Sequence, residues 1–378
     1  PLANALVIPV LSITVPAGLI LSIAGVFTEG VMTYPVQAEE YLLTWIQWVA
    51  ATVGGQQASY VTGHLLSPML FGVWITAILL IASVRIPQIR WKVLSLFLIC
   101  ISVMIVHLTI KKPAVHQLEI TFLDVGQADA AHIKTPDNRH LLIDTGRWSP
   151  GSNSADRVLL PYFNDLGIRK LDAVFLTHPH ADHIGGIAEL IDSMEIGTIY
   201  QTDLDYDSEL FRNYMRKAEE KRIPVQFISA GEVLTPDPTI RIFVLGPRSE
   251  GIKAANPNNN SLALKLVYGR KSILFTGDAE REQEAELITM YGEFVDSDLY
   301  QAGHHGSNTS NSSFFMDRIT PDYTVISLAF KNQFGHPDPE AITRLKRENS
   351  KISYTSLEGA VRYSTDGVTF RKMNWQKQ

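Results

Sequence analysis

The pattern of hydrophobic positions divides the chain into two unlike parts. Up to about residue 112 the sequence is apolar and carries few charges, whereas from Leu118 onward short hydrophobic runs alternate with charged and turn-forming stretches. The second pattern is typical of a globular domain. The change falls near Lys111, so we expect two regions, residues 1–112 and 113–378.

Three apolar stretches of the first region are long enough to cross a membrane, because a hydrocarbon core of roughly 30 Å needs about 20 apolar residues in a helix. Residues 2–27, 65–84 and 93–110 contain no formally charged side chain. Such runs are rare as buried core helices of a soluble fold, so we expect transmembrane helices. The chain begins at Pro1 without a basic signal-peptide region, and we expect it to be a fragment of a longer protein.

The charges of the loops predict an orientation in the membrane. Residues 85–92, after the second span, carry three basic residues, whereas the first loop carries glutamates and no Lys or Arg. The positive-inside rule places the basic loop in the cytoplasm. One further crossing puts residues 113–378 on the extracytoplasmic side of the cell (inner) membrane, although Lys111 and Lys112 weakly favour the opposite side.

The second region mixes strands and helices throughout, which predicts an α/β fold. Two mixed β-sheets with helices on their outer faces would produce this pattern, but periodicity alone does not choose that layering over another. The strand-like runs are 118–125, 141–144, 171–177, 240–245, 261–267 and 273–276, and the helix-like segments are 156–166, 184–194, 209–221, 280–291 and 339–348.

One short motif carries the chemistry. His178, His180, Asp182 and His183 lie within six residues, directly after a hydrophobic strand. Side chains so crowded would destabilise one another unless a cation neutralised the carboxylate and accepted the imidazole lone pairs, so a plain polar turn is the weaker interpretation. The H-x-H-x-D-H spacing matches the metallo-β-lactamase-like pattern, in which the first two His bind one metal and the Asp and last His bind another. We therefore predict an αββα metallo-β-lactamase fold.

The remaining metal ligands must come from later in the chain. No histidine lies between His183 and His304, so the candidates are His304, His305 and His336, each next to a glycine or close to one. Glycine permits close approach of the backbone to a site. Asp278, at the end of a hydrophobic strand, is the natural bridging carboxylate.

Composition limits the alternatives. The single cysteine, Cys100, lies in an apolar run, which excludes an intrachain disulfide and a cysteine-based metal site. The net charge of −6 does not support strong unspecific adhesion to nucleic acid, because phosphate-binding surfaces are usually basic. A polyanionic substrate would have to be held locally.

Five motifs follow one another along the second region: Phe122–Gln127, Leu142–Gly146, His178–His183, Thr276–Asp278 and Gly303–Ser307. Together they resemble the ComEC family, the bacterial competence proteins that form a DNA-uptake channel. The resemblance spans residues 118 to about 370 and implies an inner-membrane channel with an appended hydrolase domain that degrades the DNA strand that is not imported. Where the family usually has Gly-Gln-Gly-Asp, this chain has residues 126–129 as Gly-Gln-Ala-Asp, which should disturb the turn only slightly.

The order of ligands differs from that of the lactamases, which place a third histidine before the bridging aspartate. Asn260 and its neighbours occupy that region here. We therefore assign His304 to the metal of His178 and His180, and His336 to the metal of Asp182 and His183. His305 would be a proton donor on the substrate side or would support a ligand from behind, and a plain surface role is equally open.

The expected chemistry is hydrolysis of a phosphodiester by two divalent ions, Zn²⁺ or Mn²⁺, which can activate water and hold both reacting oxygens. Asp182 and His305 are the candidate catalytic groups, and Asp144 would orient a metal-binding histidine. Contacts to the substrate are expected from Ser307, Asn308 and Asn260. For Ser307 and Asn308 a purely structural role in the loop is equally open.

Several readings of function remain open. The leading one is an extracytoplasmic nuclease domain attached to a DNA-translocating channel, with DNA, the membrane and other competence proteins as partners. A second keeps the site but changes the substrate to teichoic acid or a phosphorylcholine-type phosphodiester, since this fold hosts many chemistries. A third makes the domain a non-catalytic docking module of a transporter, and the complete set of candidate ligands argues against it.

Overall fold

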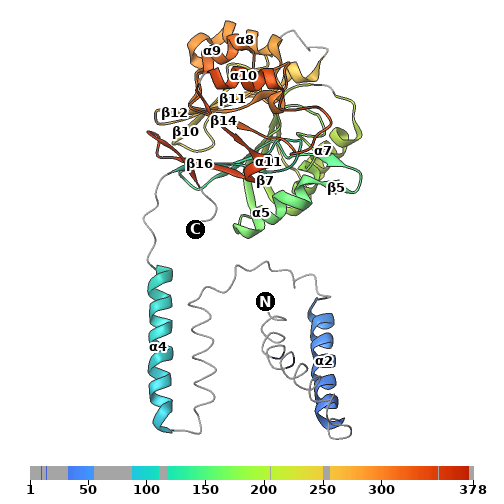
Figure 1. Cartoon of the computed structure of the whole chain (residues 1–378), viewed down its shortest axis with the longest axis vertical. Helices are drawn as coiled ribbons and strands as arrows, with labels where there is room; N and C mark the ends of the chain where they lie inside the picture. The colour runs from blue at the N-terminus through green and yellow to red at the C-terminus, as the bar shows by residue number, and fades with distance from the viewer. Residues whose placement is uncertain are drawn as a thin grey trace. The chain divides into compact units, whose positions relative to one another are not determined.

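The computed structural model shows two compact units, Pro1–Lys111 and Lys112–Gln378 (Figure 1). The residues that the structure describes are 10, 14, 33–54, 87–109, 117–204, 206–249, 256–347 and 349–373.

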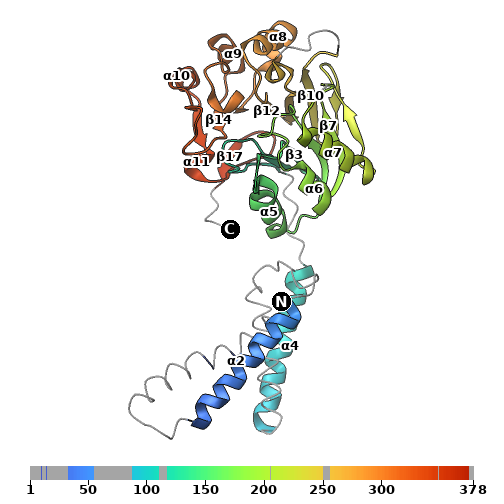
Figure 2. The ribbon, with the colours of Figure 1, turned by 90° about the vertical axis from the view of Figure 1, so that its right-hand side faces the viewer.

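The first unit contains two long helices, α2 (Thr33–Gly54) and α4 (Pro87–Thr109) (Figure 2). Within the described part of the chain, none of the helices combines the length and the apolar character that a bilayer crossing requires. The predicted span 93–110 overlaps α4, whereas 2–27, apart from two positions, and 65–84 lie outside the described residues. The three spans stay a prediction.

The second unit consists of two β-sheets that lie face to face, with helices on their outer sides (Figures 1 and 2). The eight-stranded sheet has the order β17-β16-β1-β2-β3-β6-β7-β8, and the seven-stranded sheet has the order β15-β14-β13-β12-β11-β10-β9. The strands of these two sheets are β1 (Leu118–Phe122), β2 (Ala131–Lys134), β3 (His140–Ile143), β6 (Lys170–Phe175), β7 (Glu195–Gln201), β8 (Val225–Phe227), β9 (Val233–Leu234), β10 (Ile240–Gly246), β11 (Ala263–Tyr268), β12 (Lys271–Phe275), β13 (Leu299–Gln301), β14 (Tyr323–Ile326), β15 (Lys351–Tyr354), β16 (Val361–Thr365) and β17 (Phe370–Met373). Two further strands, β4 (Trp148–Ser149) and β5 (Ser152–Asn153), form a separate two-stranded sheet.

Alternation along the strands builds a core between the sheets. Leu118, Ile120 and Phe122 of β1 point into it and are fully buried, and the ring centroid of Phe122 lies 6.1 Å from that of Phe275 in the opposite sheet. Burying each such side chain stabilises the fold by about 1.5–3 kcal/mol.

Helices cover the outer face of each sheet through two further hydrophobic clusters. One is formed by the eight-stranded sheet with α5, α6 and α7, and the other by the seven-stranded sheet with α8, α9 and α10. The four-layer αββα fold expected from the sequence is thus confirmed. The helical segments are η3 (Ala155–Leu159), α5 (Leu160–Asp165), α6 (Ile187–Ser193), α7 (Glu209–Glu220), η4 (Pro257–Asn260), α8 (Arg281–Tyr291), η5 (Gly292–Val295), η6 (Gly303–Gly306), α9 (Ser313–Ile319), α10 (Pro339–Arg347) and α11 (Thr355–Glu358).

Strand direction brings several loops to one edge of the sheets. β3 pairs with β6 in parallel, and β12 pairs with β13 in parallel, so the loops that follow these strands leave on the same side within each sheet. β2 is antiparallel to β3, with Ala131 opposite Ile143, so the segment before β2 also reaches this edge. The candidate ligands all lie in these loops or close to them.

Candidate metal centre

The H-x-H-x-D-H motif forms a tight loop after β6. Backbone amides of His183 and Ile184 both donate to the carbonyl of His180 at 3.0 Å, which turns the chain back on itself. Gly185 closes the loop against a neighbouring segment, because a Cβ there would lie 2.1 Å from the backbone nitrogen of Trp148. This packing brings the rings of His178 and His183 within 4.1 Å of each other, and both residues are buried.

Asp144 fixes the orientation of His183. Its Oδ2 atom accepts hydrogen bonds at 2.8 Å from Nδ1 of His183 and from the hydroxyl of Thr177, and its Oδ1 atom accepts the Thr177 amide at 2.8 Å. With its Nδ1–H engaged in this way, His183 directs the lone pair of Nε2 toward the centre. The geometry is the one expected for Asp144 as a residue that orients a ligand.

Asp278 lies in the middle of the histidines. Its Oδ1 atom is 3.2 Å from Nε2 of His183 and 3.9 Å from Nε2 of His305. Its Oδ2 atom is 3.6 Å from Nε2 of His304 and 3.8 Å from Nε2 of His178. The two carboxylate oxygens therefore face two different pairs of imidazoles, as a bridging ligand requires.

A second buried carboxylate, Asp129, lies beside this group. One possible ligand atom from each of Asp129, His183, Asp278 and His305 lies within 4.8 Å of the others, and all four residues are buried. In the sequence, Asp129 was considered only as part of a turn motif. A signal was present, because an aspartate between the buried alanines 128 and 130 needs a polar or charged partner.

Four atoms of this cluster are buried and make no hydrogen bond within the described residues: Asp129 Oδ1, His183 Nε2, Asp278 Oδ1 and His305 Nε2. Each such group costs about 1–3 kcal/mol when it stays unsatisfied. Carboxylate oxygens and imidazole nitrogens are also the donors that Zn²⁺ and Mn²⁺ accept. The residues present therefore fit a divalent ion.

Electrostatics at the centre favour a positive charge. Burial lowers the pKa of His183, but the charges of Asp278 and Asp144 more than offset it, so that the pKa lies well above its usual value. Burial also lowers the pKa of His305, but the charges of Asp129 and Asp278 more than offset it and hold this pKa well above its usual value. Burial and the neighbouring His183 instead hold the pKa of His178 well below its usual range. Protons or a cation must balance the carboxylates here.

His178, His180 and His304 form the other side of the centre. Nε2 of His178 lies 3.0 Å from Nδ1 of His180, whose ring is half-buried and lies 5.8 Å from the ring of Tyr206. Nδ1 of His304 faces a carboxylate that was not predicted, Oε1 of Glu280, at 3.6 Å.

The contacts of His305 and His336 suggest another grouping of the ligands, and which metal each histidine binds stays a prediction. Nε2 of His305 lies 3.6 Å from Oδ2 of Asp182, and its Nδ1 donates to the carbonyl of Ser327 at 3.0 Å. His336 instead lies beside His304, with ring centroids 5.6 Å apart. It is therefore His305, rather than His336, that joins Asp182.

Backbone geometry explains this exchange. Consecutive residues His304 and His305 both have a positive φ, of 51° and 52°. This left-handed turn sends the two neighbouring imidazoles to different oxygens of Asp278. Sequence spacing gives no sign of such a turn.

The three predicted substrate contacts have partners within the protein. Oδ1 of Asn308 accepts Nη1 of Arg344 at 3.0 Å, and the buried Ser307 hydroxyl lies 3.1 Å from that of Thr309. Asn260 is buried, and its Nδ2 donates to a backbone carbonyl at 3.3 Å. These contacts stabilise the loops around the centre, and the role in substrate binding stays a prediction.

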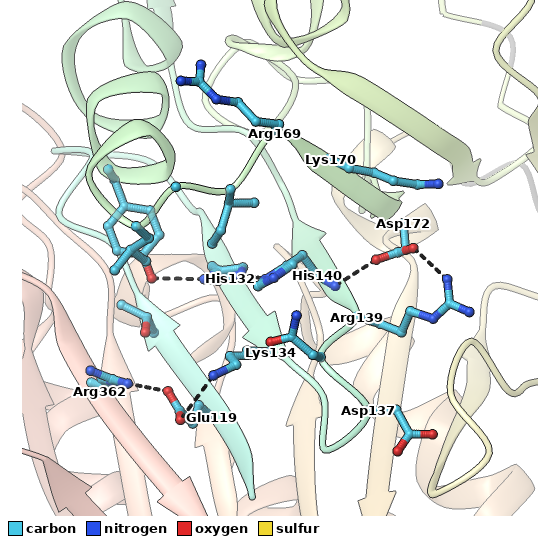
Figure 3. Close-up of a pocket in the computed structure, with 16 residues that line it drawn as sticks. Glu119, His132, Lys134, Asp137, Arg139, His140, Arg169, Lys170, Asp172 and Arg362 are labelled. Atoms are coloured by element: carbon cyan, nitrogen blue, oxygen red, sulfur yellow. Dashed lines mark hydrogen bonds and ion pairs between the residues drawn. The ribbon is translucent and has the colours of Figure 1, made fainter. Parts of the chain in front are cut away.

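A large cavity lies elsewhere, on the outer face of the eight-stranded sheet (Figure 3). It has a volume of about 670 Å³ and is lined by His132 of β2 and by His140, the first residue of β3. Four of its basic side chains are already in ion pairs, which weakens the attraction of an anion. These pairs are Lys134–Glu119, Arg362–Glu119, Arg139–Asp172 and Lys170–Glu195.

Comparison with known proteins agrees with the geometry. The chain is 26% identical to ComE operon protein 3 of Bacillus subtilis over 337 residues. This match covers 86% of this chain and 43% of that protein. It is 29% identical over 270 residues to competence protein ComA of Neisseria gonorrhoeae, covering 70% of this chain and 36% of that protein. The resemblance to the competence family is confirmed, and the chain spans less than half the length of these relatives.

A solved structure and a family model were also matched. The metallo-beta-lactamase fold protein YhfI from Bacillus subtilis is 14% identical, with a TM-score of 0.46, and covers 66% of this chain and 100% of its own. The model of the metallo-beta-lactamase superfamily, whose members are generally metal-dependent hydrolases, matches residues 123–329, more than half of the chain. The chain belongs to the metallo-beta-lactamase superfamily.

Proposed function

We propose that this chain is a metal-dependent phosphodiesterase that cleaves DNA during DNA uptake. One observation carries the proposal. Buried ligand atoms that make no hydrogen bond within the described residues converge on Asp278, and the two oxygens of this carboxylate face separate groups of imidazoles. The arrangement suits two adjacent ions. The competence relatives act in DNA uptake, and DNA is therefore the proposed substrate.

The residues divide into two candidate ligand groups that share Asp278. When bound, two divalent ions would lower the pKa of a water molecule and hold the attacking and leaving oxygens of a phosphodiester. Zn²⁺ and Mn²⁺ both suit histidine and carboxylate ligands. One group is His178, His180 and His304, and the other is Asp182, His183 and His305, with Asp129 beside it.

Other residues hold these ligands in place. Asp144 keeps Nε2 of His183 directed at the centre, and the carbonyl of Ser327 does the same for His305. Asp182 has a side chain that is 34% exposed, unlike the buried His183 and Asp278. It is thus the acidic ligand nearest to solvent, where a substrate would enter, and it suits the predicted catalytic role.

The wider setting is part of the proposal. We place the catalytic domain on the extracytoplasmic side of the cell membrane, attached to spans within residues 1–112, where it degrades the strand that is not imported. Duplex or single-stranded DNA and other competence proteins would be its partners. The support is the charge pattern of the loops and the similarity to competence proteins.

Hydrolysis of labelled DNA tests the proposal. The 378-residue chain, purified in detergent, is incubated with labelled single- and double-stranded DNA in Mn²⁺ or in Zn²⁺, beside its Asp182→Asn variant, and bound metal is measured by mass spectrometry. We expect cleavage that requires metal and falls at least a hundredfold in the variant, since removing one group of a catalytic site typically costs that much. Bound metal without DNA cleavage would overturn the choice of substrate. A chain that binds no metal would overturn the enzyme assignment.

A further inference from the structure

Two exposed aromatic rings lie in the loop that carries His336. Phe330 and Phe334, in the loop between β14 and α10, are 70% and 59% exposed. The ring of Phe334 lies 5.8 Å from that of His336, which in turn lies 5.6 Å from the ring of His304. The aromatic surface is therefore continuous with the histidines of the centre.

Hydrogen bonds hold this loop in a defined shape. Nδ2 of Asn332 donates to the carbonyls of His336 at 2.6 Å and of Ala329 at 3.3 Å, and its Oδ1 accepts the amides of Phe334 and His336. Oε1 of Gln127 accepts the amide of Ala329 at 3.2 Å. The exposed rings are thus presented on a preformed loop, which lowers the entropy lost when a ligand binds.

A third ring flanks the opposite group of histidines. Tyr206, which is half-buried, lies 5.8 Å from the ring of His180 and stands at an angle of 66° to it. Aromatic side chains therefore lie against two histidines near the centre, Tyr206 against His180 and Phe334 against His336. Folding gains little from leaving Phe330 and Phe334 in water, so their exposure indicates a binding role.

We infer that Phe330, Phe334 and Tyr206 stack against the bases of single-stranded nucleic acid whose backbone lies at the metal centre. This inference rests on the proposed function and adds the strandedness of the substrate. A base offers a free π-face only when it is unpaired, and aromatic side chains that stack on bases bind single strands without regard to sequence. The chain has a net charge of −6, so its affinity for DNA must depend less on phosphate attraction and more on such uncharged contacts.

Insertion into a lipid surface is the other use of exposed phenylalanines. Single strands are favoured here because the ring of Phe334 packs against His336 and continues to His304, so that lipid around it would also cover the entrance to the centre. The exposed Lys331 between the two phenylalanines suits a phosphate backbone as well.

Binding to a strand without bases isolates the stacking contribution. The 378-residue chain in detergent, with a chelator to prevent cleavage, is titrated by fluorescence anisotropy with a ten-nucleotide thymidine strand and with an abasic strand of the same length. We expect the wild-type chain to bind the thymidine strand at least tenfold more tightly. We expect the Phe330→Ala/Phe334→Ala variant to lose most of this preference and Phe334→Trp to keep it. Leu357→Ala, a change at a side chain that is 64% exposed in α11, is the matched control.

Three results would overturn the inference. These are equal binding of both strands by the wild-type chain, an unchanged preference in the double alanine variant, and tighter binding of duplex than of single strand. A blue shift of the indole added in Phe334→Trp on mixing with phosphatidylglycerol bicelles, without a response to the thymidine strand, would assign the rings to lipid instead. Metal-dependent hydrolysis of bis(p-nitrophenyl) phosphate is measured in parallel. If the wild-type chain shows no such hydrolysis, the proposed enzyme is contradicted, whereas a wild-type chain that hydrolyses this substrate but binds both strands equally contradicts the stacking surface alone.

Discussion

Replacing Asp144 with Asn tests how the centre is assembled. The carboxylate is 1% exposed and accepts three hydrogen bonds of 2.8 Å, one from His183 and two from Thr177. An amide has nearly the same shape but can accept at only one of its two terminal atoms. Nδ1–H of His183 would then face an N–H donor, and the ring would relieve the clash by moving its proton to Nε2. That nitrogen could no longer bind a metal.

The size of the effect follows from this geometry. Loss of the partner that orients a metal-binding histidine costs roughly 10- to 100-fold in metal affinity. This range corresponds to about 1.4–2.7 kcal/mol of binding free energy. The buried amide also leaves one donor without a good acceptor, so the free energy of unfolding of the metal-free chain should fall by about 1–3 kcal/mol.

Chelator competition measures the affinity, and urea unfolding of the metal-free chain measures the stability. Asp172→Asn is the matched control, because this carboxylate on β6 accepts the amide of His140 and Nη1 of Arg139, both at 2.9 Å, away from the centre. We expect the control to keep the wild-type metal affinity. An Asp144→Asn chain that binds metal within twofold of wild type would refute the proposed role of this carboxylate.

Three further predictions concern pH and the ligand assignment. Burial raises the pKa of Glu284 to about 7, above its unfolded value of 4.5, so its contribution to stability is complete below pH 4.5 and is lost as the pH rises to 7. Unfolding at pH 5 and 8 should show a fall of up to about 3 kcal/mol that Glu284→Gln removes. Burial lowers the pKa of His132 to about 3, so the contribution of this residue to stability is present above pH 6.5 and is lost as the pH falls toward 3. A His132→Gln chain whose stability falls with acid as steeply as that of the wild type would contradict this. His305→Ala should bind less metal by mass spectrometry than His336→Ala, and equal losses would argue against the assignment of His305 to the ligands.

The sequence predicted the layers of the fold because periodicity reports which faces of a segment are buried. The run 261–267 corresponds to β11 and the segment 209–221 to α7, which begins after Ser208, whose hydroxyl accepts the amide of Phe211. Shorter strands such as β13 and β14 were not predicted. Both lie inside the seven-stranded sheet, and a strand of three or four residues is too short to show a period.

The candidate site was predictable in its composition but not in its pairing. The H-x-H-x-D-H spacing identified four clustered side chains, because so many ligands in one turn have few structural explanations. The distribution of His305 and His336 depends on two consecutive left-handed residues, and a propensity argument assigns this backbone to glycine. Asp129 was missed for a related reason, since its importance comes from pairing across the sheet with residues more than 50 positions away.

The location of the centre links its chemistry to the stability of the domain. Asp144 and His183 follow strands of the eight-stranded sheet, whereas Asp278 and His305 follow strands of the seven-stranded sheet. The hydrophobic core joins the two sheets over most of their area, but at this edge the contact consists of buried carboxylates and imidazoles with unsatisfied atoms. A bound ion would satisfy these atoms and connect the sheets at once. The hydrophobic core brings the two strand edges together before any metal binds, and this pre-formed arrangement raises the affinity of the ligands for a metal ion. Metal binding would in turn stabilise the folded domain, because it removes the cost of the unsatisfied polar atoms.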